Sequence, residues 1–191
     1  MKLVAGDQEF TQKLTVLKDP HSGGNEADIA ANTKMVTALR DAMNGIADTV
    51  AQAGSVRVQL ATMRKEVGTE EVSKPVRDAS EEMDGKLTAI EGHVLNFAIT
   101  GRGQDDIRFA PMLADKLGYL AGEVGGSDFA PTTQQQQVFD ELTRQELAFE
   151  NDLDLFLSKD VVAFNNLLKE RNASYIMVNP RKEKRALGAA K

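Results

Sequence analysis

The feature that most constrains the fold is a long row of apolar residues spaced by three and four positions. Residues with this spacing lie along one side of an α-helix, so the row predicts one helix over about residues 26–67 with a buried face. At ~1.5 Å per residue, such a helix is roughly 60 Å long. A bend or break is expected around Gly54, because glycine in a helix costs ~1 kcal/mol relative to alanine. The row consists of Ile29, Val36, Leu39, Met43, Ile46, Val50, Ala53, Val56, Leu60, Met63 and Val67.

Three further stretches show the same spacing. They predict a second helix that begins at Pro75, a third over about residues 111–124 and a fourth over about residues 133–170. The connection between the first two helices is short, so these helices should lie antiparallel. We therefore predict a mainly α fold, an antiparallel three- to four-helix up-down bundle over residues 25–171. The inward positions are Val76, Met83, Leu87, Ile90, Val94 and Phe97; Leu113, Leu117, Leu120 and Val124; and Val138, Phe139, Leu142, Phe149, Leu153, Phe156, Leu157, Val161, Phe164 and Leu168.

Residues 1–20 have a pattern typical of β-structure. Two apolar residues precede a Gly6-Asp7 turn, and apolar residues then recur at even spacing, which places them on one face of a strand. The pattern predicts a short N-terminal β-hairpin that ends at Asp19-Pro20. Such a hairpin is marginally stable alone, so it either packs on the helices or completes a β-domain elsewhere, and we favour the second because other strand patterns are few. The apolar positions are Leu3, Val4, Phe10, Leu14 and Val16.

Composition excludes several classes of function. The net charge of −6 argues against a nucleic-acid partner, because binding to phosphates requires a surplus of Lys and Arg. Cysteine is absent, which excludes disulfides, thiolate metal sites and cysteine nucleophiles. No apolar run approaches the ~20 residues of a membrane span, and the first residues do not form a signal peptide. Residues 172–191 are predicted to form an irregular basic tail, with five Lys or Arg and one Glu from Arg181 onward.

A di-iron centre is the first metal site to consider in a helical bundle. Its ligands include two Glu-x-x-His pairs on facing helices. This chain has two histidines, His21 in the joint before the first helix and His93 near the end of the second. Glu91 precedes His93 by two positions, not three. The sequence therefore excludes a di-iron site, and we interpret His93 as a packed or half-exposed side chain.

The remaining polar motifs also have structural interpretations. The acidic residues at 81–84 and 105–106 lack the alternating oxygen ligands and the central glycine of a calcium loop. The Gly101-Arg102-Gly103 sequence lacks the Gly-Lys-Ser/Thr ending of a phosphate-binding loop. No Ser-His-Asp arrangement is recognisable. We therefore predict no catalytic residue, no cofactor and no metal ligand in this chain.

Two carboxylates fall on the apolar side of the fourth predicted helix. They are Glu146 and Asp160. A buried carboxylate requires a partner, since removing an unpaired charge from water is costly. On spacing alone, we expect that partner to be Arg144 or Lys159.

Three stretches follow the order of a known bacterial family. They are FTQKLTVLKDP at residues 10–20, the segment at 112–146 that contains GEVGGSDFAPTTQQQQ, and FNNLL with YIMVNP near the end. Over about residues 3–180 the chain resembles the C-terminal region of large exported proteins built around a β-propeller of BNR or sortilin (VPS10-like) repeats, often labelled glycosyl hydrolases. The matching residues are Thr11, Leu14, Val16, Asp19, Pro20, Lys116, Leu117, Ser127, Asp128, Pro131 and Thr132.

The resemblance implies a non-catalytic terminal module. Its partner would be a preceding β-rich or propeller domain of the same parent protein, and its location periplasmic or secreted. Any hydrolysis of sugars that the family label implies would occur in the propeller. This chain has no tryptophan and therefore no Asp-box motif, and no catalytic residue can be carried over to it.

Two other functions stay open on the sequence. In the first, an acidic residue of this region completes the active site of a glycoside hydrolase, which needs two carboxyl groups about 5–10 Å apart. In the second, the chain is a free-standing coiled-coil adaptor that forms a homo-oligomer through the first helix. We favour the structural and interaction module, which packs against or orients a β-rich partner.

Overall fold

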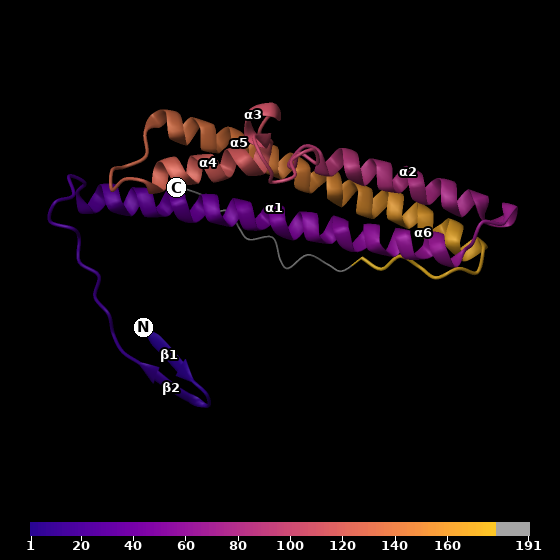
Figure 1. The fold of residues 1–191 in the computed structure, drawn as a ribbon, viewed down its shortest axis with the longest axis horizontal. Helices are drawn as coiled ribbons and strands as arrows, with labels where there is room; N and C mark the ends of the chain where they lie inside the picture. The colour runs from indigo at the N-terminus through magenta and orange to yellow at the C-terminus, as the bar shows by residue number, and fades with distance from the viewer. Residues whose placement is uncertain (179–191) are drawn as a thin grey trace.

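The computed structural model describes residues 1–178, apart from the side chain of Asp106. It is mainly helical, with a two-stranded antiparallel hairpin at the N-terminus (Figure 1). This confirms the predicted fold class. The predicted basic segment from Arg181 to Lys191 lies outside the described residues.

The longest element is α1 (Glu26–Glu66), which runs along the whole bundle (Figure 1). Its start is fixed by a capping box: the Asn25 side chain accepts a hydrogen bond from the Asp28 backbone at 2.9 Å, and the Asp28 carboxylate accepts one from the Asn25 backbone at 3.2 Å. The helix continues unbroken through Gly54, so the expected break is absent. The burial of Ala53 and Val56 on either side holds this stretch against the neighbouring helices.

The other helices form two more rods beside α1. One rod consists of α2 (Lys74–Glu91) followed by α4 (Leu113–Gly125), which both run back against α1. The third rod consists of α5 (Thr133–Leu155), a π-helical turn at Phe156–Asp160 and α6 (Val161–Glu170), and it runs parallel to α1. The bundle therefore has three rods in cross-section. The rod formed by α2 and α4 is interrupted halfway along its length.

The interruption divides the core into two clusters. One lies around the first half of α1, α4 and α5, and the other around the second half of α1, α2 and α6. Most of their members are apolar positions that the helical spacing predicts, but Met35, Ala42 and Ile176 are buried without having been predicted. The predicted inward positions Met43, Phe97 and Val138 are exposed, and Phe97 lies beyond the end of α2. The first cluster contains Met35, Leu39, Ala42, Ile46, Val94, Leu113, Leu117, Leu120, Val124, Leu142 and Phe149. The second contains Ala53, Val56, Leu60, Met63, Val76, Met83, Leu87, Leu153, Phe156, Val161, Phe164, Leu168 and Ile176.

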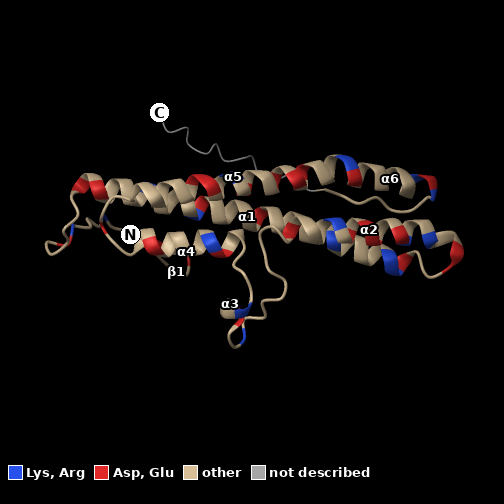
Figure 2. Cartoon of the chain, turned by 90° about the horizontal axis from the view of Figure 1, so that it is seen from above, with Lys and Arg blue, Asp and Glu red and all other residues tan. Residues whose placement is uncertain are grey.

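The connection between α2 and α4 projects from the bundle (Figure 2). It contains α3 (Asp105–Arg108), a single helical turn. Gly101 and Gly103 both have positive φ, near +70°, which glycine adopts readily in tight turns. The structure therefore supports a turn here.

Residues 173–178 return along the bundle in an extended conformation. Two side-chain amides hold them. Gln59 of α1 donates to the Met177 carbonyl and accepts from the Met177 N–H, both at 2.8 Å. Asn165 of α6 contacts Ile176 in the same two-pronged way, at 3.0 and 2.8 Å. This backbone pairing buries the Ile176 side chain in the second core cluster.

The N-terminal hairpin consists of β1 (Lys2–Ala5) and β2 (Gln8–Thr11). It lies away from the helices, and every residue from 1 to 20 is exposed (Figure 1). The second strand is shorter than predicted. It ends at Thr11, because β1 extends no further and the next residues have no neighbouring strand with which to pair.

Candidate functional site

One face of the hairpin is uncharged and carries two large apolar side chains. Leu3 and Phe10 are directly opposite in the antiparallel register, so their side chains lie on the same face. Lys2 and Glu9 lie on the other face, where their side chains form an ion pair at 2.7 Å. Val4, which is opposite Glu9, also lies on this charged face, whereas the face of Leu3 and Phe10 carries no charge and is the one suited to pack against a further layer.

The chain after β2 continues the apolar pattern without a partner strand. Gln12 still exchanges hydrogen bonds with Met1, but within the described residues no backbone hydrogen bond is made from residue 13 to residue 18. Leu14 and Val16 keep the even spacing of Phe10, and Val16 is 85% exposed. Unpaired backbone groups beside exposed apolar side chains make this segment a template for strand addition.

A second candidate region is a set of charges between α1 and α2. Arg57 of α1 places its guanidinium nitrogens 2.6 Å from Glu91 Oε2 and 2.7 Å from Asp84 Oδ1, and it donates to Thr88 at 3.1 Å. Burial alone would lower the pKa of Arg57, but the contacts with Asp84 and Glu91 outweigh burial and raise it. Glu91 is 2% exposed. The group is therefore a partly buried set of ion pairs that joins α1 to α2, a structural arrangement.

The third candidate is Glu146, which α5 directs toward α1. Its residue exposure is 4%, and its Oε2 atom has no hydrogen-bond partner among the described residues. Burial, helped by the nearby charge of Glu150, raises the pKa of Glu146 from 4.5 to about 7. Raised carboxyl pKa values occur in catalytic acids, but those lie in clefts beside a substrate. Glu146 is instead enclosed by helices.

Gly45 of α1 makes room for this carboxyl group. A Cβ atom at position 45 would lie 2.6 Å from Glu146 Oε1, whereas one at Gly54 of the same helix would meet nothing within 4 Å. We expect Gly54→Ala to raise the free energy of unfolding by ~1 kcal/mol through helix propensity. Gly45→Ala should gain nothing or lose stability, because the carboxyl group must move. Urea denaturation measures both.

The background variant Glu146→Ala provides the control for this pair. Without the carboxyl group, Gly45→Ala should stabilise the protein about as much as Gly54→Ala does. If Gly45→Ala and Gly54→Ala are equally stabilising in the wild-type background, the proposed close contact does not limit the site.

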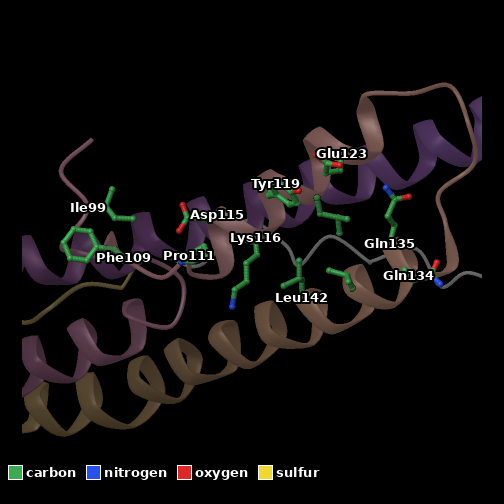
Figure 3. Close-up of a pocket in the computed structure, with 12 residues that line it drawn as sticks. Ile99, Phe109, Pro111, Asp115, Lys116, Tyr119, Glu123, Gln134, Gln135 and Leu142 are labelled. Carbon is green, nitrogen blue, oxygen red and sulfur yellow. The ribbon is translucent and has the colours of Figure 1, made fainter. Parts of the chain in front are cut away.

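A groove lies between α4 and α5 and has a volume of about 760 Å³ (Figure 3). One wall comes from α4 between Asp115 and Glu123 and the other from α5 between Gln134 and Leu142, and the connection that contains α3 closes one end. Most of the lining is aliphatic or aromatic. The lining residues are Ile99, Phe109, Pro111, Asp115, Lys116, Tyr119, Leu120, Glu123, Gln134, Gln135, Val138 and Leu142.

The structure places the polar residues that the sequence analysis considered in separate positions. His93 is exposed in the turn after α2. The Asp105 carboxylate accepts hydrogen bonds from Thr100, which lower its pKa and order the turn at residues 100–105. Within the described residues, no group of three or more His, Asp or Glu side chains could hold a metal ion. No described helix is both long and apolar enough to cross a bilayer.

The predicted partners of the Glu146 and Asp160 carboxylates are wrong. Arg144 pairs with Glu141 at 2.8 Å and does not meet Glu146. Asp160 pairs with Lys86 of α2 at 2.7 Å, and this contact raises the pKa of Lys86. The error arose because spacing along one helix shows only neighbours on that helix, whereas the Asp160 partner comes from another.

Comparison with known proteins gives no match: no family model, no curated protein and no solved structure matches the chain.

Proposed function

We propose that this chain is a non-catalytic structural and interaction module whose N-terminal segment joins a β-rich partner domain. The observation that carries the proposal is the exposed apolar face formed by Leu3 and Phe10, with Leu14 and Val16 on the extended segment that follows. A two-stranded hairpin in water gains little from its own contacts. A β-rich partner would remove the exposed apolar side chains from water and would also supply hydrogen bonds to the backbone of residues 13–18.

The bundle supports a module of this kind in two ways. Its three rods make a stiff body, with α1 running the whole length beside two separate cores. The apolar face of α1 is already buried inside the chain, at positions such as Leu39, Val56 and Leu60. Little of it is left for pairing with a second copy, so we propose the module in preference to an adaptor that dimerises through α1.

The partner that we propose is the β-propeller protein of the BNR or sortilin-like kind that the sequence resembles. In that arrangement the hairpin would complete the last sheet before the helical region, and any glycoside hydrolase activity would belong to the propeller part. The motif FTQKLTVLKDP, which carries the resemblance, covers the same residues whose apolar side chains are exposed. A periplasmic or secreted location is part of this proposal.

Binding to a recombinant propeller protein of that family, prepared without its helical terminus, tests the proposal. We expect wild-type chain to bind and Phe10→Asp to bind at least tenfold more weakly, because a charge enters the covered face. Val58→Asp is the matched control, since Val58 is an equally apolar, exposed residue on α1. Isothermal titration calorimetry measures both.

Two results would contradict the proposal. One is equal binding by Phe10→Asp and wild type, which would place the contact elsewhere. The other is hydrolysis of aryl glycosides by the purified chain, which would make the chain itself an enzyme.

A further inference from the structure

The groove between α4 and α5 has the size and lining of a small-molecule site. Its volume of about 760 Å³ lies within the range of roughly 300–1,000 Å³ that ligand sites occupy. Leu120 of α4 and Leu142 and Val138 of α5 line the space between the helices, and Phe109 and Pro111 close one end (Figure 3). An apolar chain is the kind of ligand group that such walls would bury.

The charges along the groove are arranged unevenly. Lys116, in the first turn of α4, is the one cationic side chain among the lining residues, and no ion pair is formed by it within the described residues. The carboxylate of its neighbour Asp115 is turned back to accept a hydrogen bond from the Met112 N–H at 2.9 Å. Glu123 lies seven residues further along α4, or roughly 10 Å away by helical rise.

The backbone of α4 adds to this polarity. The first turn of a helix carries partial positive charge and the last turn partial negative charge. Lys116 is in the first turn of this 13-residue helix, and Glu123 is near its end. A negative group would therefore be favoured at the Lys116 end and disfavoured at the Glu123 end.

From these observations we infer that the groove binds an anionic amphiphile, a long-chain carboxylate whose head pairs with Lys116 and whose chain lies over Leu120, Val138 and Leu142. The carboxylate head would form an ion pair with the Lys116 ammonium group, which has none within the described residues. The alkyl chain would be removed from water against the aliphatic wall. This inference is independent of the hairpin, which lies elsewhere on the molecule (Figure 1).

Titration of the full chain with three probes below their micelle-forming concentrations tests the inference. The probes are dodecanoate, dodecanol and dodecylamine, which share a chain and differ in the charge of the head. We expect one dodecanoate to bind per chain, at least tenfold more tightly than dodecanol, with dodecylamine weakest. Equal affinity for dodecanoate and dodecanol, or the absence of saturable binding, would overturn the inference.

Variants locate the site. Lys116→Met should lower dodecanoate affinity at least tenfold and bring it to the level of dodecanol, whereas Lys34→Met, at an exposed lysine of α1, should leave it unchanged. Val138→Glu should abolish binding of both probes, because it places a charge in the apolar wall. Val138 is exposed, so this variant should fold, which circular dichroism checks. Unchanged affinity in both groove variants would place the amphiphile elsewhere and overturn the assignment.

Discussion

Replacing Arg57 with methionine is expected to lower the free energy of unfolding by about 3–5 kcal/mol. The substitution leaves the Glu91 carboxylate, which is 2% exposed and lies 2.6 Å from the guanidinium, buried without its charge partner. It also removes the 2.7 Å contact with Asp84, so α1 loses two fastenings to α2. Urea denaturation followed by circular dichroism measures the change.

A double-mutant cycle separates the buried charge from the loss of packing. Glu91→Gln in the Arg57→Met background should recover a large part of the stability, because a neutral amide is less costly to bury than a carboxylate. Arg40→Met is the matched control on the same helix. Arg40 pairs with Asp41 at the surface, and exposed pairs contribute about 0–1 kcal/mol. Similar losses for Arg57→Met and Arg40→Met would show that the buried pair has no special role.

The second large effect should appear in the dependence of stability on pH. The pKa of Glu146 is about 7 in the folded chain, against 4.5 for an ordinary glutamate. The folded state therefore holds its proton more tightly than the unfolded state does. Through this group, stability is highest below pH 4.5, falls between pH 4.5 and about 7, and changes little above that. The total fall is about 3 kcal/mol, because each pKa unit corresponds to 1.36 kcal/mol.

Glu146→Gln should remove this dependence. At pH 8 the variant is expected to be more stable than wild type by up to about 3 kcal/mol, and near pH 4 the two should be nearly equal. Glu81→Gln, at an exposed position of α2, is the control and should leave the difference between pH 4 and pH 8 unchanged. Glu150→Gln should lower the pKa of Glu146, since the charge of Glu150 raises it. A wild-type stability that rises from pH 4.5 to 7 with no change in Glu146→Gln would contradict this account.

The helices were predictable because apolar spacing is a local property of the sequence. The row from Ile29 to Val67 gave α1 within one residue of its observed end, and the cap at Thr132 agrees with the predicted start of α5 at Thr133. Gly54 misled the prediction, because a propensity of ~1 kcal/mol is overcome by burial of the residues around it. The predicted length of β2 was wrong because the local pattern alone does not decide where a strand ends. Alternation continues to Val16, but a strand also requires a neighbour.

The contacts between distant residues were beyond reach of the sequence. Arg57 and Glu91 are 34 positions apart in the sequence, and only the fold places the guanidinium against the buried Glu91 carboxylate. The partner of Asp160 came from α2, and Gly45 became a recess only because α5 places a carboxyl group opposite it. The groove likewise lies between two helices that are separate in the sequence, α4 and α5. Each of these features arises from the packing of rods, which one-dimensional spacing does not specify.

The interruption between α2 and α4 divides the molecule into two halves along its length. Each half has its own apolar centre, and the chain between α2 and α4 loops outward after Val94 and Leu95, which pack in the first cluster. Extra sequence could therefore be accommodated at that loop while the α1 backbone continued to connect the halves. Insertions of different lengths in this connection would leave the helices at both ends of the bundle intact.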